Sequence, residues 1–359
     1  MAQDILGEKK YFAAANSGTG FQSYYKYIFD SNKFNSLIII KGGSGTGKSS
    51  FARKLARECE KRGGQTEYFY CSSDPASLDG VILTLSDGRR IAALDGTAPH
   101  MRDTELPGCC DVLHDTGKYW SVSALAQRRE EIERYAKERK ERFKDVYCHL
   151  SAALAAERVA DRIIEKNTDI PKLDGAVSRI FRKIGVREGK GTVEYRLTDS
   201  IGMRGRVRFN TFCERADTVY RVTGAGWKIF FSRLIAAIAE KKADTVLSPY
   251  FLDTESFCGV LLTDTAFGGS VAFVREERYD TAKNEDRIIN TARFSEVKEK
   301  QERREIKKVQ KLSEVSLLSA EESFSEIRGL HFILEEIYSE AMDFKRKDRE
   351  EKAIIDALF

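Results

Sequence analysis

The sequence predicts an α/β fold in which a parallel sheet, duplicated in tandem, carries long helical appendages. An apolar strand, a glycine-rich loop and a helix follow one another between residues 37 and 62, and a weaker copy of this pattern begins about 180 residues later. Each copy is followed by a long charged stretch with helical spacing. At 359 residues, the chain can hold two domains that each bury a core.

Composition narrows the class of protein. Hydrophobic residues make up 42% and charged residues 32%, as in globular chains, and no apolar run approaches the roughly 20 residues of a membrane span. The first residues lack a signal-peptide pattern, so we expect a cytoplasmic protein without a membrane partner. Seven cysteines without a C-x-x-C pair favour reduced thiols over a zinc site. A net charge of +4 is too small to argue for a nucleic-acid partner.

Residues 42–49 carry the most specific motif of the chain. They fit G-x-x-x-x-G-K-[ST], the phosphate-binding loop of P-loop NTPases, with the sequence Gly42-Gly43-Ser44-Gly45-Thr46-Gly47-Lys48-Ser49. Glycines let backbone N–H groups turn onto phosphate oxygens. In this motif Lys48 reaches the β- and γ-phosphates of a nucleotide, and the Ser49 hydroxyl ligates Mg²⁺. With Ser50, these residues form the candidate nucleotide-binding segment.

The segments on either side of the motif support it. Residues 37–40 form a short apolar run that is typical of a buried parallel strand. Residues 49–62 predict a helix with Phe51, Leu55 and Cys59 on one face and a stop at residues 63–64. The N-terminus of such a helix also favours an anion. The context therefore predicts a P-loop NTPase-type sheet.

Upstream of the motif, residues 11–15 predict a short strand, followed by a glycine-containing turn. Residues 22–29 predict a helix with three tyrosines, Tyr24, Tyr25 and Tyr27. These rings could flank a purine, although aromatic residues in such a segment more often belong to the core.

Asp74 follows the next predicted strand, residues 66–71. Ligands of open α/β sheets bind beyond the carboxyl ends of the strands, so Asp74 is placed to orient an attacking water or an acceptor hydroxyl. An equally good interpretation is an aspartate that makes the turn before Pro75.

A second acidic residue, Asp95, ends the apolar run 91–94. This is the form of a Walker B segment, whose aspartate holds the Mg²⁺ shell. His100, five residues further on, would then lie near the γ-phosphate and could sense it or transfer a proton, unless it only packs its loop. Gly96 stands where many ATP hydrolases have a glutamate that activates water, which argues against rapid turnover.

Two charged stretches, residues 121–166 and 276–359, predict long amphipathic helices that pack on each other or on a protein partner. Interleaved acidic and basic residues indicate a solvated, salt-bridged face rather than a nucleic-acid surface. We divide the chain into a nucleotide-binding domain (1–120), a helical appendage and linker (121–190), a degenerate repeat (191–280) and a C-terminal helical appendage (281–359).

The repeat lacks the residues that the motif needs. An ungapped alignment places Lys228 over Lys48, with Trp227 over Gly47 and Ile229 over Ser49. Either Val274 or Arg275 stands at the position of Asp95. We expect this half to keep the fold without binding nucleotide, and Lys228 to be an ordinary surface lysine.

In order along the chain, segments 11–21, 41–49, 71–82 and 94–100 resemble an uncharacterised bacterial family of tandem-duplicated P-loop ATP-binding proteins, described as ATPase-like or nucleotide-kinase-like. The resemblance covers the first ~120 residues. It implies that Lys48 and Ser49 bind nucleotide and Mg²⁺. Members of the family typically have both loops intact, and this chain departs from them in its second half.

These observations predict Mg²⁺-dependent ATP (or GTP) binding and slow hydrolysis in the first half. Lys48, Asp74 and His100 are the candidate catalytic residues, and Ser49 and Asp95 the candidate Mg²⁺ ligands. One alternative is a small-molecule or nucleotide kinase, to which an arginine-bearing lid would contribute Arg89, Arg90 and Arg102. The other is a nucleotide-gated binding protein, in which the nucleotide state sets how the helical appendages engage a partner.

Overall fold

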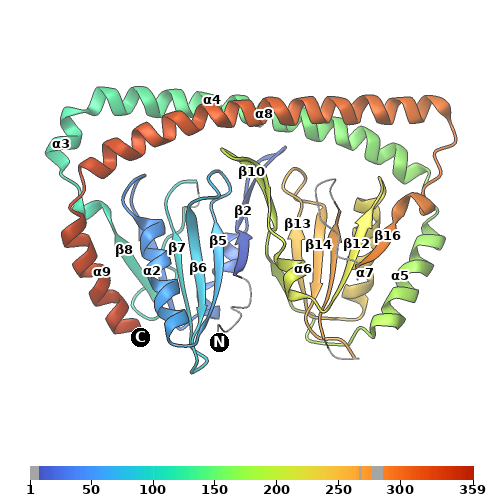
Figure 1. Cartoon of the computed structure of the whole chain (residues 1–359), viewed down its shortest axis with the longest axis horizontal. Coiled ribbons are helices and arrows are strands. Elements are labelled where there is room, and N and C mark those ends of the chain that lie inside the picture. Colours follow the sequence, from blue (N-terminus) through green and yellow to red (C-terminus); the bar gives the residue numbers. More distant parts are fainter. Residues whose placement is uncertain (1–7, 100, 267–268, 277–285) are drawn as a thin grey trace, which may run out of the picture.

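Two six-stranded sheets lie side by side beneath a pair of long helices in the computed structural model, which describes residues 8–99, 101–266, 269–276 and 286–359 (Figure 1). The first sheet has the order β1 (Lys9–Phe12), β5 (Gln65–Tyr70), β6 (Leu78–Thr84), β7 (Arg90–Asp95), β4 (Ser36–Lys41) and β8 (Asp111–Asp115). The second has the order β16 (Arg287–Asn290), β12 (Thr218–Thr223), β15 (Val271–Arg275), β14 (Phe257–Leu262), β13 (Thr245–Pro249) and β9 (Val193–Tyr195).

Each sheet is mostly parallel, and one strand in each, β6 or β14, runs against its two neighbours. The prediction of an α/β fold is confirmed, but the prediction of a wholly parallel sheet is wrong at this strand. Residues 71–77 join β5 to β6, and residues 85–89 join β6 to β7. Such short connections cannot form the crossover that parallel neighbours require, so the strand turns back.

The elements around the phosphate-binding motif form as predicted. Strand β4 is buried along residues 37–40 and leads through the glycine-rich loop into α2 (Lys48–Lys61). That helix buries Phe51, Leu55 and Cys59 against the sheet. Three single-turn 3₁₀ helices lie elsewhere in the described chain: η1 (Ser31–Lys33), η2 (Gly117–Tyr119) and η3 (Thr291–Phe294).

The helix predicted over residues 22–29 forms only at residues 25–28. This segment instead completes a hairpin of β2 (Ala14–Ser17) and β3 (Gly20–Ser23), and only α1 (Tyr25–Ile28) is helical. Tyr25 is buried, and the rings of Tyr24 and Tyr27 lie 5.2 and 5.4 Å from the ring of Tyr195 in the second half. The tyrosines therefore belong to the core and to the contact between halves.

The two charged stretches pack on each other. Helix α3 (Val122–Gln127) precedes α4 (Arg129–Lys166), which runs antiparallel to α8 (Lys300–Glu340) above both sheets (Figure 1). We call this helix pair the arch. Its inner surface buries Val146, Leu150 and Phe324, among other side chains. Among the described residues, no helix is long and apolar enough to cross a membrane.

Each helix of the arch is followed by one further helix, which packs on the opposite half of the chain. Helix α5 (Ile170–Ile184) follows α4 and packs against α7 (Trp227–Glu240) of the second half, whereas α9 (Phe344–Leu358) follows α8 and packs against α2 of the first half (Figure 1). Each half is therefore completed by a helix that is attached to the other.

Several elements occur as equivalent pairs in the two halves. In three of these pairs the two ends of the element are displaced by the same number of residues, although this number differs from one pair to another. The bounds of α5 and α9 differ by 174 residues at both ends, those of α2 and α7 by 179, and those of β4 and β12 by 182. Hairpin β10 (Asp199–Gly202) and β11 (Gly205–Arg208), followed by α6 (Thr211–Arg215), stands where β2, β3 and α1 stand in the first half. The change from 182 to 179 means that the second half has lost three residues between strand and helix.

Candidate functional site

The glycine-rich loop already has the backbone conformation that the motif requires. Gly42, Gly45 and Gly47 have φ values of 151°, 71° and 79°, which residues with a side chain rarely adopt. A Cβ at Gly42 would also overlap the hydroxyl oxygen of Thr116. The loop is thus a cradle of bare backbone at the end of β4, which suits the close approach of a phosphate.

Lys48 closes this cradle. Its Nζ donates hydrogen bonds to the carbonyl oxygens of Gly42 (2.8 Å) and Gly43 (2.6 Å), and it lies 3.4 Å from Oδ2 of Asp95. The side chain is only 12% exposed, yet Asp95 is its one carboxylate partner in the described part of the chain. Its ammonium is therefore held at the loop by two short hydrogen bonds to carbonyl oxygens, which a bound anion would replace.

Asp95 and Ser49 provide the oxygens that a hard cation prefers. Asp95 ends β7, which is the direct neighbour of β4, and it pairs in register with Ile40. Its carboxylate accepts a hydrogen bond from the backbone N–H of Thr97 at 2.9 Å, and Ser49 Oγ accepts one from the backbone N–H of Leu78, also at 2.9 Å. Both side chains line the same cleft, so the donor set fits Mg²⁺, which takes one or two protein oxygens and keeps several waters.

Asp74 lies in this cleft, as predicted, and also makes the predicted turn. Its Oδ1 accepts a hydrogen bond from the backbone N–H of Ala76 at 3.2 Å, and the residue is 9% exposed. The same oxygen lies 3.3 Å from Nε of Arg204, which comes from the β10–β11 hairpin of the second half. His100 lies outside the described residues.

Beyond the loop, the cleft is lined by parts of the chain that sequence analysis did not implicate. The cleft, about 710 Å³ in volume, brings the loop together with Asp74, Asp79 and Asp95. The arch and the second half add five further residues: Arg139 and Phe143 from α4, Met203 from the β10–β11 hairpin, and His331 and Glu335 from α8. None of these five belongs to a recognisable motif, because they meet the loop only through packing of the two halves.

The C-terminal helices cover the loop closely. A Cβ at Gly45 would overlap the backbone carbonyl oxygen of Glu335 in α8, and one at Gly47 would lie 2.9 Å from Nζ of Lys347 in α9. The loop therefore packs directly on backbone and side chains that follow it by almost 300 residues.

Behind the loop, Lys347 belongs to a buried polar cluster. Its Nζ lies 2.8 Å from Oε1 of Glu351, and both side chains are at most 2% exposed. Lys54 Nζ is 3.0 Å from the other oxygen of Glu351, and His114 Nε2 is 3.8 Å from the first. Burial alone would raise the pKa of Glu351, but the nearby side chains of His114, Lys347 and Lys54 hold that pKa below its usual value.

His331 connects the arch electrostatically to the loop. Burial lowers the pKa of this imidazole from its ordinary value; Glu335 opposes the shift, whereas the nearby cations Arg139 and Lys48 add to it. Asp74 also acts on the same ring. Residues from α4, α8 and the loop are therefore within electrostatic reach of one another.

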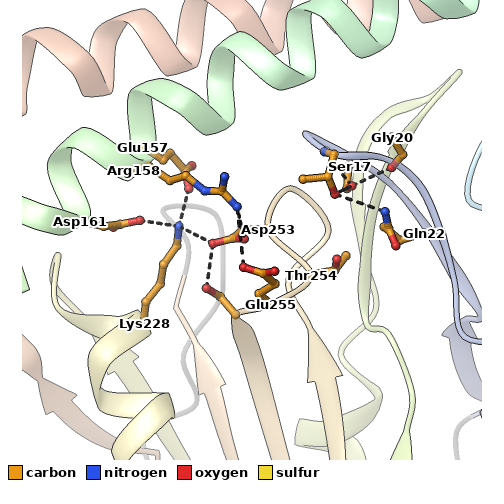
Figure 2. A network of polar contacts seen from close by, with 12 residues as sticks. Ser17, Gly20, Gln22, Glu157, Arg158, Asp161, Lys228, Asp253, Thr254 and Glu255 are labelled. Atoms are coloured by element: carbon orange, nitrogen blue, oxygen red, sulfur yellow. Dashed lines mark hydrogen bonds and ion pairs between the residues drawn. The ribbon is translucent and has the colours of Figure 1, made fainter.

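The corresponding cleft of the second half is organised around an internal ion-pair network (Figure 2). Nζ of Lys228 lies 2.7 Å from Asp161, 3.0 Å from Glu157 and 3.5 Å from Asp253. With its side chain 11% exposed, Lys228 is not the surface lysine that the sequence predicted. Arg158 also reaches Asp253, at 3.6 Å.

The loop itself differs between halves in a way that ungapped alignment concealed. Three residues, 224–226, separate β12 from α7, where six residues, 42–47, separate β4 from α2. Gly224, with a φ of 86°, takes the place of Gly42. Leu94 pairs with Gly80 as Val274 pairs with Gly259, so Arg275 stands at the position of Asp95. The phosphate cradle is thus shortened as well as substituted.

The arginines considered for a kinase lid do not meet at the first cleft. Arg89 binds Asp87 at 2.7 Å, Arg102 lies 3.2 Å from Glu105, and Arg90 stacks over the ring of Phe34.

Comparisons with family models, with curated proteins and with solved structures found no match to this chain. The case for a function therefore depends on the geometry of the site.

Proposed function

We propose that the first half binds Mg²⁺ and a nucleoside triphosphate, ATP or GTP, at residues 42–50 and hydrolyses it slowly. The observation that carries this proposal is the preformed glycine cradle, with Lys48, Ser49, Asp74 and Asp95 around one cleft. Lys48 and the loop amides would neutralise the β- and γ-phosphates, while Ser49 and Asp95 would hold the metal. Bound Mg²⁺ supplies charge neutralisation on the phosphate oxygens.

Slow turnover follows from how the carboxylates are engaged. Gly96, which has no side chain, follows Asp95, so no second carboxylate is placed there to activate water. Asp74 could orient the attacking water, but its Oδ1 also holds the turn and lies 3.3 Å from Arg204. His100 stays a candidate from its place in the sequence.

One observation favours a second candidate, a nucleotide-gated binding protein. Helix α8 both lines the cleft with His331 and Glu335 and forms half of the arch. A ligand at the loop would therefore touch the element with the largest surface for a protein partner. Tight binding with negligible turnover would favour this role over hydrolysis.

The test is calorimetric titration of the full chain with ATP and Mg²⁺, together with release of ADP, for the wild type, Lys48→Ala and Lys61→Ala. We expect one nucleotide per chain and a loss of about 10- to 100-fold in affinity for Lys48→Ala, because charge-assisted hydrogen bonds to phosphate are removed. Lys61, an exposed lysine at the end of α2, is the matched control and should leave affinity unchanged. Two nucleotides per chain, or a Lys48→Ala variant that binds like the wild type, would contradict the proposal.

A further inference from the structure

Arg139 is a cation of the first cleft whose role the phosphate loop does not explain. It lies on α4 and lines the cleft together with Phe143, one turn further along. Two other arginines of this helix are paired with carboxylates: Arg129 lies 2.7 Å from Glu133, and Arg142 lies 2.8 Å from Glu326. Within the described chain, Arg139 has no carboxylate within 4 Å.

Arg139 faces the part of the cleft where the triphosphate would end. Arg139, Lys48, Asp74 and His331 all line this cleft, and the charges of the first three act on the imidazole of His331. In the phosphate-binding motif, Lys48 marks the β- and γ-phosphates. A planar guanidinium on the arch side of this region has the geometry and charge to bind phosphate oxygens through two parallel hydrogen bonds.

The second half shows what this position holds when the loop is lost. The arch helices align with a shift of 174 residues, as the buried pairs Val146 and Ala320, and Leu150 and Phe324, indicate. The same shift places Ser313 where Arg139 stands, and Ser313 lines the second cleft. An arginine is thus present at this position beside the intact loop, and a serine takes its place beside the shortened one, where Lys311 of α8 also lines the cleft.

The acidic residues follow the opposite pattern. By the same shift, His331 and Glu335 of the first cleft correspond to Glu157 and Asp161 of the second. In the second cleft these two carboxylates neutralise Lys228, at 3.0 and 2.7 Å (Figure 2). Of these two positions in the first cleft only Glu335 is acidic. Lys48 has one carboxylate partner within the described chain, whereas Lys228 of the second cleft has three.

We propose that Arg139 binds the terminal phosphate of the nucleoside triphosphate held by the loop. This inference rests on the proposed function and names the partner of one residue within it. Because Arg139 belongs to the arch, the terminal phosphate would link the loop to α4, and loss of that phosphate would break the link.

The test compares two nucleotides that differ in the terminal phosphate. Dissociation constants for Mg²⁺–ADP and for a Mg²⁺-bound, non-hydrolysable triphosphate with a β,γ-imido bridge are measured on the full chain of the wild type, Arg139→Ala and Arg142→Ala. We expect Arg139→Ala to weaken the triphosphate analogue by about 10- to 100-fold and to change ADP affinity by less than about twofold. Arg142→Ala, a variant of the same helix outside the cleft, should change neither.

Two outcomes would overturn the inference while leaving the proposed function intact. They are an equal loss for both nucleotides in Arg139→Ala, and no loss for either. Lys48→Ala separates the two levels of the argument, since it should weaken both nucleotides. A wild type that binds neither nucleotide would overturn the proposed function and this inference with it. Equal melting temperatures of Arg139→Ala and Arg142→Ala exclude a folding defect as the cause of a difference.

Discussion

The two halves share one topology, and the lysines at the start of α2 and α7 differ in their surroundings, although the shift of 179 residues places Lys228 at the position of Ser49 and Trp227 at that of Lys48. Lys48 bonds to carbonyl oxygens of its own loop and has a single carboxylate at 3.4 Å, whereas Lys228 lies within 3.5 Å of three carboxylates. A lysine that the chain itself neutralises contributes to the fold, and one held over bare backbone is available to an anion. One half thus holds a lysine that three carboxylates of the chain neutralise, and the other holds a lysine with one carboxylate nearby.

The exchanged helices show the same contrast beside the loop. In the first half α9 buries Lys347 and Glu351 near His114; with the shift of 174, α5 buries Leu173 and Val177. The strand registers place Ile289 at the position of His114. An exposed pair is kept in both halves: Lys54 and Asp348 at 2.7 Å, and Arg233 and Asp174 at 2.6 Å. Only the half with the intact loop has a charged core behind it.

The largest expected effect comes from breaking that charged core. Glu351→Ala leaves Lys347 buried without its partner and should lower the free energy of unfolding by about 3–5 kcal/mol, as measured by urea titration. Val177→Ala, at the equivalent position of α5, should cost about 2 kcal/mol, since two buried methyl groups are lost.

A double variant copies the second half into the first and serves as the control. Lys347→Leu with Glu351→Val removes both charges, and its stability should equal or exceed that of the wild type by up to about 4 kcal/mol. A Glu351→Ala variant as stable as the wild type would show that the buried pair does not stabilise this interface.

Lys228→Ala should have the next largest effect on the free energy of unfolding. It removes the cation that neutralises Glu157, Asp161 and Asp253, and we expect a loss of about 3 kcal/mol in the free energy of unfolding. Lys241→Ala, an exposed lysine at the end of the same helix, should change the free energy of unfolding by less than about 0.5 kcal/mol. Equal effects of the two variants would mean that Lys228 is a surface residue after all.

Acid should lower the free energy of unfolding more in the wild type than in the double variant Lys347→Leu with Glu351→Val. The pKa of Glu351 is lower in the folded protein than its ordinary value of 4.5, so its contribution is complete above about pH 4.5 and is lost as the pH falls through the folded pKa. Unfolding measured by urea at pH 7, 4.5 and 3 should therefore show a steeper decline in the wild type than in Lys347→Leu with Glu351→Val. Parallel declines would argue against a charged Glu351.

The smallest expected effect on stability concerns the exposed ion pair that both halves contain. Asp348→Ala and Asp174→Ala each remove the acidic member of an exposed pair, and each should cost about 0–1 kcal/mol in free energy of unfolding. Similar values would show that the exchanged helices are held in the same way outside their cores. A difference above about 1 kcal/mol would mean that the charged core strengthens the exposed pair.

Sequence patterns predicted the elements that depend on residues close together in the chain. The motif at residues 42–49, the apolar strand before it, helix α2 and the helices of the arch all follow from local spacing. The same patterns failed where distant contacts decide. Residues 22–24 form part of a hairpin rather than a helix, and Lys228 is buried because α4 supplies its partners.

The sequence by itself predicted an α/β chain with two similar halves, one of which carries a phosphate-binding motif. A loop of this kind depends on glycines and a lysine within eight residues, so its pattern is visible in one dimension. Only the tertiary structure decided that the arch closes the cleft with Arg139 and His331, and that α9 rather than α5 covers the loop. These contacts join residues up to about 300 positions apart. They arise because each half is covered by a helix that is attached to the other half, and no local spacing records that exchange.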